Sequence, residues 1–243
     1  ETYKDKSNNW LSPEEVVSTD GKTFFKKNNS SEKVIVGPVE SMSKSKKNTI
    51  DPEKIIDNYG ADAVRLFILS DSPPEKDIQW SDQGIIASHK FVQKFWILHK
   101  KIIQKKGNKQ KSENDLELNK FTNQIMNKIN QSLERFSYNT IISSLHEIYN
   151  FYNKLIDKQL EIKNLIDNYT NVLKIMMPVI PHFASECLSE ISKPSNLDWP
   201  DVNKELLEKN ENKIIIQING KKREIVTSTK NYTEDELTNE IKR

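Results

Sequence analysis

Long segments with apolar residues three and four positions apart occupy residues 82–177. This spacing places the apolar side chains on one face of an α-helix, which is the pattern of an amphipathic helix. Because the connections between these segments are short, consecutive helices are expected to pack antiparallel. The sequence therefore predicts a mainly α protein with an antiparallel helical bundle. The expected helices cover residues 82–105, 114–136, 139–157 and 159–177, with a shorter helix after Pro178 and Pro181.

The first 60 residues carry signals of a different kind. Turn residues alternate with short β-type runs at Thr23-Phe24-Phe25 and Val34-Ile35-Val36, which predicts a small hairpin module with a thin core. Asp51 then offers an N-cap, Pro52 stands at the first helical position, and Gly60 marks a helix end. A second helix is expected directly after it.

The end of the chain combines a hairpin signal with a helix signal. Asn219-Gly220 separates the β-type runs 214–218 and 223–226, and an Asn-Gly pair there favours a tight turn because both residues need positive φ. Thr233 and Glu236 then form a capping-box pattern for a last helix. These signals predict the start of a small α/β domain, and we expect the chain to stop inside that domain.

Composition limits the kinds of site that the chain can hold. A net charge of +2 means that anion binding must come from local clusters rather than from the whole surface. Cys187 is the only cysteine, which excludes an internal disulfide and a multi-cysteine zinc site, and its apolar neighbours predict a packing role. No run of 18 or more apolar residues occurs, so no membrane span is expected.

Residues 41–48 read SMSKSKKN and stand directly before the helix start at Asp51. The ammonium groups of Lys44, Lys46 and Lys47 lie within four positions, with serine hydroxyls between them. Such a loop has little to bury and can close over an anionic ligand through charge-assisted hydrogen bonds. The pattern favours a phosphate-handling loop, and the alternative on composition alone is a solvated charged linker.

Several motifs resemble one family in the family's own order. Residues 41–45 resemble the KMSKS signature of class I aminoacyl-tRNA synthetases, and DPEKIIDNYGADAVRLFIL resembles the continuation of that signature. PPEKDIQWSD (73–82) and KFVQKFW (90–96) are most similar to leucyl-tRNA synthetases. MPVIPHFASE (177–186) resembles the anticodon-binding-type bundle of those enzymes, and IIIQINGKKR (214–223) resembles the opening of their C-terminal domain.

The resemblance implies a domain organisation for the whole chain. It implies the end of a class I catalytic domain with its signature loop, a helical bundle that docks tRNA, and the first part of a C-terminal domain. The implied segments are a small β-rich, leucine-specific-like insertion at 1–40, the end of the catalytic domain at 41–81, the bundle at 82–193, a linker at 194–212 and a partial α/β domain at 213–243.

The resemblance also implies ATP-dependent attachment of leucine to tRNA(Leu) through a leucyl-adenylate. It casts Lys44 as the catalytic phosphate contact, because an ammonium brought to the departing pyrophosphate stabilises the transition state. Ser41 replaces the first lysine of the signature, and Lys46 or Lys47 is a candidate to supply the missing charge. Mg²⁺ is expected with ATP, and no metal is expected to be ligated by this chain. The implied ATP-binding residues are Ser41, Met42, Ser43, Lys44 and Ser45.

For tRNA, the candidate contacts are Lys221, Lys222 and Arg223, beside the Asn219-Gly220 turn, because the resembled domain touches the outer corner of tRNA. Cationic side chains at such a corner would bind the RNA backbone through phosphates. The expected enzyme is cytoplasmic and monomeric.

The second ATP signature of the family is missing, because none of the four histidines stands in a His-x-Gly-His arrangement. The chain begins Glu1-Thr2-Tyr3-Lys4, without an initiator methionine, so we expect it to start inside a longer protein and to be inactive alone. Two alternatives stay open. One is another class I synthetase for an aliphatic amino acid, isoleucine or valine, and the other is a non-catalytic helical tRNA-binding module.

Other residues with possible chemistry are interpreted as structural. His182 is expected to be a satisfied core histidine, and the lysines between residues 100 and 111 to be a solvated helix end and loop. Trp80 is less easily assigned, because its ring could pack the base of the signature loop against the bundle. Four aromatics at helical spacing are expected in the core rather than as base-stacking platforms: Trp96, Phe136, Tyr149 and Tyr152.

Overall fold

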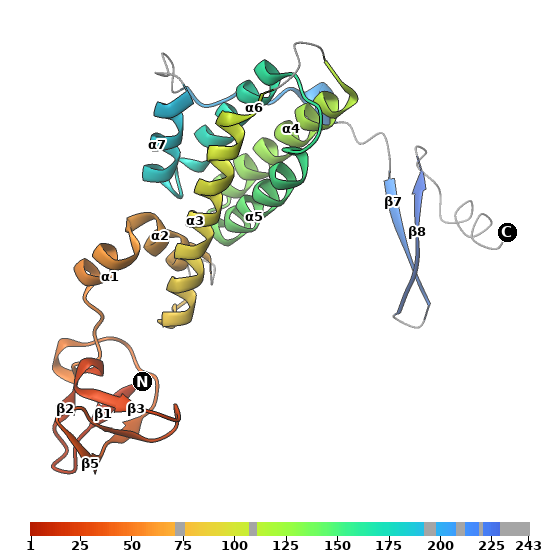
Figure 1. Ribbon diagram of the computed structural model, residues 1–243. Helices are drawn as coiled ribbons and strands as arrows, with labels where there is room; N and C mark the ends of the chain where they lie inside the picture. The colour runs from red at the N-terminus through yellow and green to blue at the C-terminus, as the bar shows by residue number, and fades with distance from the viewer. Residues whose placement is uncertain (71–75, 107–110, 192–197, 208–211, 219–220, 229–243) are drawn as a thin grey trace. The chain divides into compact units, whose positions relative to one another are not determined.

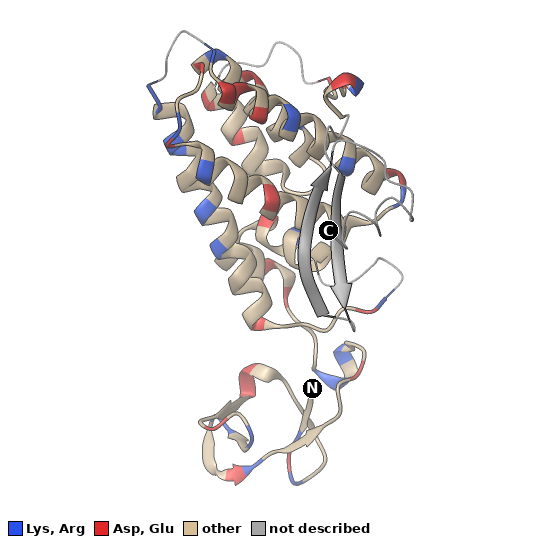
Figure 2. Ribbon diagram, turned by 90° about the vertical axis from the view of Figure 1, so that its right-hand side faces the viewer, with Lys and Arg blue, Asp and Glu red and all other residues tan. Residues whose placement is uncertain are grey.

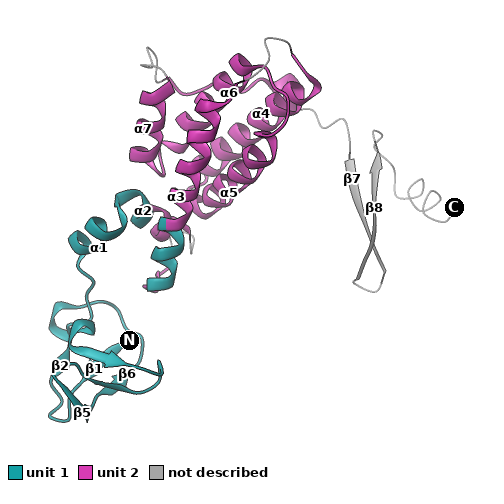
Figure 3. Ribbon diagram, in the orientation of Figure 1, with its two compact units in different colours: residues 1–64, 81–89 teal, residues 65–80, 90–243 magenta. Residues whose placement is uncertain are grey.

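The computed structural model describes residues 1–70, 76–106, 111–191, 198–207, 212–218 and 221–228, and after residue 207 it describes the backbone only. The chain forms two compact units, which Figure 3 shows in teal and magenta. Unit 1 comprises residues 1–64 and 81–89, and unit 2 comprises residues 65–80 and 90–243. Each unit is described by itself below.

Unit 1 contains two three-stranded antiparallel sheets, with strand orders β2-β1-β6 and β3-β4-β5 (Figure 1). The two β-type runs seen in the sequence contribute to β4 and β6, which belong to different sheets, although the backbone N–H of Val34 donates to the carbonyl of Phe24 at 2.8 Å. The expected hairpin is present, because β4 and β5 are consecutive antiparallel strands. The run at Thr23–Phe25 pairs with the strands next to it in sequence, and the run at Val34–Val36 pairs with the first strand of the chain. The strands are β1 (Thr2–Lys4), β2 (Trp10–Leu11), β3 (Val16–Ser18), β4 (Phe24–Lys26), β5 (Asn29–Lys33) and β6 (Ile35–Gly37).

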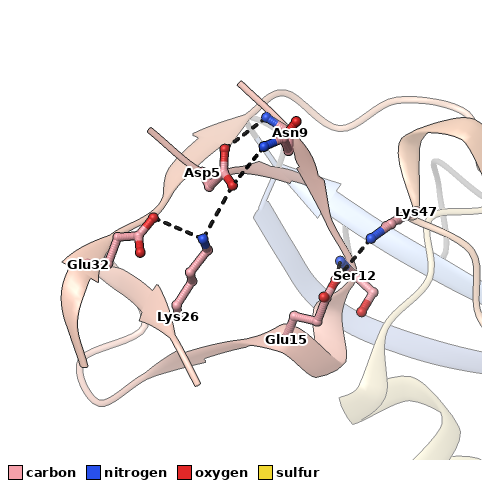
Figure 4. Close-up of polar contacts among 7 residues, drawn as sticks. All are labelled: Asp5, Asn9, Ser12, Glu15, Lys26, Glu32 and Lys47. Carbon is pink, nitrogen blue, oxygen red and sulfur yellow. Dashed lines mark hydrogen bonds and ion pairs between the residues drawn. The ribbon is translucent and has the colours of Figure 1, made fainter. Parts of the chain in front are cut away.

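Polar contacts compensate for the small apolar core of these sheets, in which Leu11 and Val34 are the only buried large apolar side chains. Figure 4 shows the carboxylate of Asp5 accepting hydrogen bonds from the backbone N–H of Asn9 at 2.9 Å and from the Lys26 ammonium at 3.3 Å. The backbone bond from Asn9 is the main reason that the pKa of Asp5 lies below its usual value. Because Asp5 follows β1 and Lys26 ends β4, this contact ties the two sheets together.

Helix α1 (Pro52–Tyr59) begins and ends where the sequence predicts. The side chain of Asp51 accepts a hydrogen bond from the backbone N–H of Glu53 at 3.1 Å, which satisfies one of the free donors at the helix start. Gly60 ends the helix with a φ of +83°, a conformation that costs a glycine little. Helix α2 (Ala61–Ser70) follows directly, as expected.

Unit 2 is a helical bundle, so the predicted mainly α fold is confirmed. The four long helices and the one shorter helix expected after residue 81 are all present, and their ends differ from the expected ones by a few residues at most. Its core is formed by the apolar faces of these helices, and Phe95, Leu145 and Tyr169 are fully buried in it. The helices are α3 (Asp82–Gln104), α4 (Glu113–Glu134), α5 (Tyr138–Leu155), α6 (Ile162–Met176) and α7 (Pro181–Ile191). The part of α3 up to residue 89 belongs to unit 1.

Most of the aromatic side chains expected in the core are there. Tyr152 is buried, and Trp96 and Tyr149 are partly buried against the core. Phe136 contradicts the expectation, because it is 63% exposed. The amphipathic pattern continues past the end of α4 in sequence, but the helix stops at Glu134, so Phe136 no longer lies on its apolar face.

Phe136 occupies the left-handed position of a helix C-cap. Its φ is +53°, its backbone N–H donates to the carbonyl of Leu133 at 3.1 Å, and the N–H of Ser137 donates to the carbonyl of Ser132 at 2.8 Å. This pair of bonds is the Schellman motif, in which glycine is the preferred residue. A side chain at this position costs about 1–2 kcal/mol.

Phe136→Gly is therefore expected to raise the free energy of unfolding by about 0.5–1 kcal/mol, because relief of strain outweighs the greater freedom of glycine in the unfolded chain. Urea denaturation followed by helical circular dichroism measures the change. Phe136→Ala is the control, since it removes the exposed ring and keeps the strain. A variant with glycine less stable than the alanine variant would contradict this account of the cap.

The segment that follows the bundle in sequence packs against the surface of the bundle. Residues 198–207, part of the expected linker, lie along α4 and include the 3₁₀ turn η3 (Lys204–Leu207). The indole N–H of Trp199 donates to Asn130 at 2.9 Å, and the backbone N–H of Asn203 donates to Asn123 at 2.7 Å. Two polar side chains of α4 thus hold this segment.

The predicted C-terminal hairpin strands are present as β7 (Asn212–Ile218) and β8 (Lys221–Ser228), which pair antiparallel. The Asn219-Gly220 turn and the capping-box helix around Thr233 and Glu236 lie outside the described residues. Within the described part of the chain, no helix is both long enough and apolar enough to cross a membrane.

Candidate functional site

The loop of residues 41–48 folds into a short, ordered turn in unit 1. Ser43 has an extended backbone and precedes the 3₁₀ turn η2 (Lys44–Lys46), and Lys47 follows the turn with a left-handed φ of +52°. The N–H groups of Lys46 and Lys47 close the turn by donating to the carbonyls of Ser43 and Lys44, at 3.1 and 3.2 Å. The loop therefore presents its lysines from a defined backbone.

Asn48 holds this backbone in place. Its side chain is buried, its Oδ1 accepts the backbone N–H of Ser43 at 2.7 Å, and its Nδ2 donates to the carbonyl of Ser41 at 3.3 Å. A second contact joins the hydroxyls of Ser43 and Ser45 at 2.8 Å. We did not expect a role for Asn48 from the sequence, although asparagine beside a loop commonly hydrogen-bonds to nearby backbone groups.

Asn48→Ala is expected to free the N–H of Ser43 for exchange with solvent, because the bond to the amide oxygen contributes about 0.5–1.5 kcal/mol. Hydrogen exchange at Ser43 should become roughly 2- to 12-fold faster. The N–H of Asn9, held by the Asp5 carboxylate in the same unit, serves as the internal control. An unchanged exchange rate at Ser43 would show that Asn48 does not fix the loop.

The three lysines of the loop differ in their partners. Lys46 forms an ion pair with Glu40, and the Nζ of Lys47 lies 3.6 Å from a carboxylate oxygen of Glu15. Lys44 is exposed, and no carboxylate among the described residues lies within ion-pair distance of its ammonium group. Lys44 is thus the lysine of this loop whose charge is uncompensated within the described residues.

The acidic partner of Lys47 comes from the turn η1 (Pro13–Glu15). Figure 4 shows Glu15 accepting the backbone N–H of Ser12 at 2.8 Å and pairing with Lys47. The bond from Ser12 is the largest cause of the lowered pKa of Glu15, so this carboxylate is ionised at neutral pH. Glu14 pairs with Lys54 of α1 at 2.8 Å. The turn η1 therefore contacts both the signature loop, at Lys47, and helix α1, at Lys54.

The remaining predicted ATP-binding residues lie on the same turn, where Ser41, Met42 and Ser45 are exposed. The predicted tRNA contacts Lys221, Lys222 and Arg223 open β8, and the first two pair with Ile218 and Gln217 of β7. The structure describes only the backbone of these three residues. The loop belongs to unit 1 and β8 to unit 2, so the two predicted sites are separate features.

The predicted packing role of Cys187 is confirmed. Its side chain is fully buried, and burial raises the pKa of the thiol to about 12, so the nucleophilic thiolate is absent at neutral pH. His182 was expected in the core and is exposed instead, because it lies in the first turn of α7 on the side opposite Phe183 and Ala184.

The histidine that is buried in the core is His99. Its Nδ1 lies 3.2 Å from the hydroxyl of Tyr169, and its Nε2 lies 3.0 Å from the carboxylate of Glu190. Burial lowers the pKa of His99 and outweighs the opposing effect of Glu190. Lys100 also pairs with Glu190, at 2.6 Å, and lies over the ring of Trp96. Lys100 is therefore partly exposed, as expected, and also has an acidic partner.

Trp80 packs against α2, with its ring 5.2 Å from that of Phe67. Among the residues that the structure describes, no three side chains of His, Cys, Asp or Glu are grouped so that they could hold a metal ion. The candidate site is thus a cationic loop.

Two protein families match this chain. Residues 115–238, just over half of the chain, match the family described as the anticodon-binding domain of tRNA ligase. Residues 5–81 match the family of class I tRNA synthetases for Ile, Leu, Met and Val. The second match contains the loop of residues 41–48.

Curated relatives match nearly the whole chain. A leucine–tRNA ligase of Bartonella tribocorum is 37% identical over 244 residues, covering 93% of this chain and 27% of its own length. That of Rickettsia massiliae is 35% identical over 240 residues, covering 97% of this chain and 28% of its own length. The chain thus spans about a quarter of the length of these relatives.

A solved structure shares the fold. It is the agnB2 LeuRS of Agrobacterium radiobacter K84 in a ternary complex with tRNA and LeuAMS, with a TM-score of 0.66, 23% identity, and coverage of 82% of this chain and 27% of that chain. The family matches, the relatives and the shared fold agree with one another. The chain therefore belongs to the class I tRNA synthetases that carry this anticodon-binding domain, and within them it is similar to leucine–tRNA ligases along almost its entire length.

Proposed function

We propose that the chain is part of an enzyme that attaches leucine to tRNA(Leu) in two steps. ATP and leucine first form leucyl-adenylate and pyrophosphate, and the leucyl group then passes to the terminal adenosine of the tRNA. The observation that carries the first step is Lys44, an exposed ammonium group without an ion-pair partner among the described residues, on a turn whose backbone is fixed by Asn48. Leucine is favoured over isoleucine and valine because the relatives are leucine–tRNA ligases.

Lys44 acts on charge that develops during the reaction. When the leucine carboxylate attacks the α-phosphorus of ATP, negative charge builds on the departing pyrophosphate. An ammonium group that meets this charge binds the transition state more tightly than the ground state and so accelerates the step. Lys44 has no role in the second step, because pyrophosphate has left by then.

Mg²⁺ enters with ATP in this proposal. The ion is proposed to be bound to the phosphates of ATP as part of the substrate. Among the described residues, no three side chains of His, Cys, Asp or Glu are grouped so that they could hold it. The complete enzyme is proposed to be a monomer of the cytoplasm. The tRNA is proposed to contact Lys221, Lys222 and Arg223 through its phosphates.

Leucine-dependent exchange of pyrophosphate into ATP tests the first step in the protein that the complete gene encodes. We expect exchange with leucine to exceed exchange with isoleucine or valine. Exchange that depends on isoleucine or valine would favour the alternative class I synthetases. No exchange with any of the three would favour the non-catalytic tRNA-binding module.

The same assay on the isolated 243-residue chain is expected to show no exchange. The chain lacks the His-x-Gly-His signature that the family uses for ATP, so it carries half of the nucleotide site. Robust leucine-dependent exchange by the isolated chain would overturn this part of the proposal.

A further inference from the structure

The part of α3 that belongs to unit 2 carries an exposed stripe of lysines. Lys90, Lys94, Ile97 and Lys101 are all exposed, and their spacing of four, three and four residues places them within about 60° of the helix circumference. With a rise of about 1.5 Å per residue, the stripe extends roughly 16 Å along the axis. We call these four residues the α3 stripe. In Figure 2, α3 carries blue segments along much of its length.

The α3 stripe brings three lysines without acidic partners onto one face of a single helix. Within the described part of the chain, no carboxylate lies within ion-pair distance of Lys90, Lys94 or Lys101. Asp82, at the opposite end, is the only acidic residue of α3. Three other lysines of unit 2 are each paired with a carboxylate: Lys128 with Glu147, Lys158 with Glu117, and Lys163 with Asp167.

An unpaired row of ammonium groups favours a ligand with regularly repeated negative charge. The side chains of lysine are flexible, so three of them can each reach a separate anion without a preformed pocket. A polyanionic backbone meets this requirement better than a single small anion does. An acidic protein partner would be expected to bury a larger apolar centre than Ile97, which is the only large apolar residue in the stripe.

We propose that the α3 stripe binds the phosphate backbone of RNA. The inference rests on the proposed function, which makes a tRNA the RNA concerned, and it adds a contact surface on α3 that is separate from Lys221, Lys222 and Arg223 on β8. Each lysine neutralises one phosphate and releases its condensed counterions, so the stripe strengthens binding in a salt-dependent manner and carries no base specificity.

The test compares two triple variants of the 243-residue chain in binding to a tRNA(Leu) transcript between 50 and 200 mM salt. K90Q/K94Q/K101Q removes the stripe, and K128Q/K158Q/K163Q removes the same charge from paired lysines. The logarithm of the binding constant falls linearly with the logarithm of the salt concentration, and each phosphate contact contributes about 0.7–0.9 to the steepness of that line. The slope of the stripe variant should therefore be shallower by about 2–3. Over this fourfold salt range, the affinity of the parent should fall about 15- to 40-fold more than that of the stripe variant. All six lysines are partly or fully exposed, so both variants should fold.

Each outcome of the test bears on one proposal. A lowered slope in the stripe variant and a nearly unchanged slope in the paired-lysine variant support the stripe. Equal slopes in the parent and the stripe variant overturn it, as does an equal loss in both variants, which would report net charge alone. Ile97→Gln should leave binding unchanged, and a loss as large as that of the stripe variant would indicate an apolar contact instead. A parent chain that does not bind the transcript would count against the proposed tRNA partner itself.

Discussion

Replacing Asp115 with alanine is expected to lower the free energy of unfolding of unit 2 by about 3 kcal/mol. The buried carboxylate accepts the backbone N–H of Ser112 at 2.7 Å, the N–H of Glu161 at 3.2 Å and the Nδ2 of Asn164 at 3.0 Å. These bonds join the start of α4 to the start of α6, and the alanine variant leaves their donors without a partner. Urea denaturation of both proteins measures the difference.

Asp167→Ala is the matched control, because that carboxylate is exposed and, among the described residues, its ion-pair partner is Lys163. It should cost less than about 1 kcal/mol, the usual range for an exposed pair. A loss below about 1 kcal/mol for Asp115→Ala would contradict the assignment of Asp115 as the link between α4 and α6.

The contribution of Asp115 should depend on pH. Burial acts to raise the pKa of this carboxyl, but the hydrogen bonds from Asn164, Ser112 and Glu161 together outweigh it and leave the pKa below its usual value. A lowered pKa in the folded state means that the stabilisation is fully present above the unfolded value of about 4 and is lost as the pH falls through the folded value. The stability difference between the parent and Asp115→Ala should therefore shrink below about pH 4.

Lys44→Ala should reduce leucine-dependent pyrophosphate exchange by the complete enzyme by roughly 10- to 150-fold, because a charge contact of about 1.5–3 kcal/mol is lost from the transition state. Lys46→Ala and Lys47→Ala are the matched controls, since both lysines are committed to carboxylates in the structure. Their effects should be smaller. They need not be absent, because exposed ion pairs are weak and either lysine can move to replace the charge missing at Ser41.

A loss of less than about tenfold for Lys44→Ala would show that another group meets the pyrophosphate. A larger loss of pyrophosphate exchange for Lys46→Ala or Lys47→Ala than for Lys44→Ala would also show that Lys44 is not the main contact of the pyrophosphate. It would also show that the ion pairs with Glu40 and Glu15 do not persist when ATP is bound.

Features that depend on neighbouring residues in the chain could be predicted from the sequence. The helices of the bundle follow from apolar spacing, and the ends of α1 follow from Asp51, Pro52 and Gly60, whose effects act within one helical turn. The pairing of β7 with β8 follows from adjacent β-type runs. The signature loop was found in the same way, because its chemistry is written in consecutive residues.

Features that depend on contacts between distant residues could not be predicted. β6 pairs with β1 across more than 30 residues, so the sequence gives no local sign of that register. His99 is buried because Tyr169 and Glu190 reach its ring from other helices, whereas His182 is exposed by its place in the first turn of α7. The partners of Lys46 and Lys47, which single out Lys44, likewise required the folded loop.

Charging of tRNA by the protein that the complete gene encodes is the most direct test of the proposed function. Purified enzyme is incubated with ATP, Mg²⁺, a tRNA(Leu) transcript and labelled leucine, isoleucine or valine, and acid-precipitable label is counted. The account predicts that leucine is attached to tRNA(Leu) and that this attachment is strongly reduced in Lys44→Ala. Attachment of isoleucine or valine in preference to leucine, or no attachment of any of the three, would contradict it.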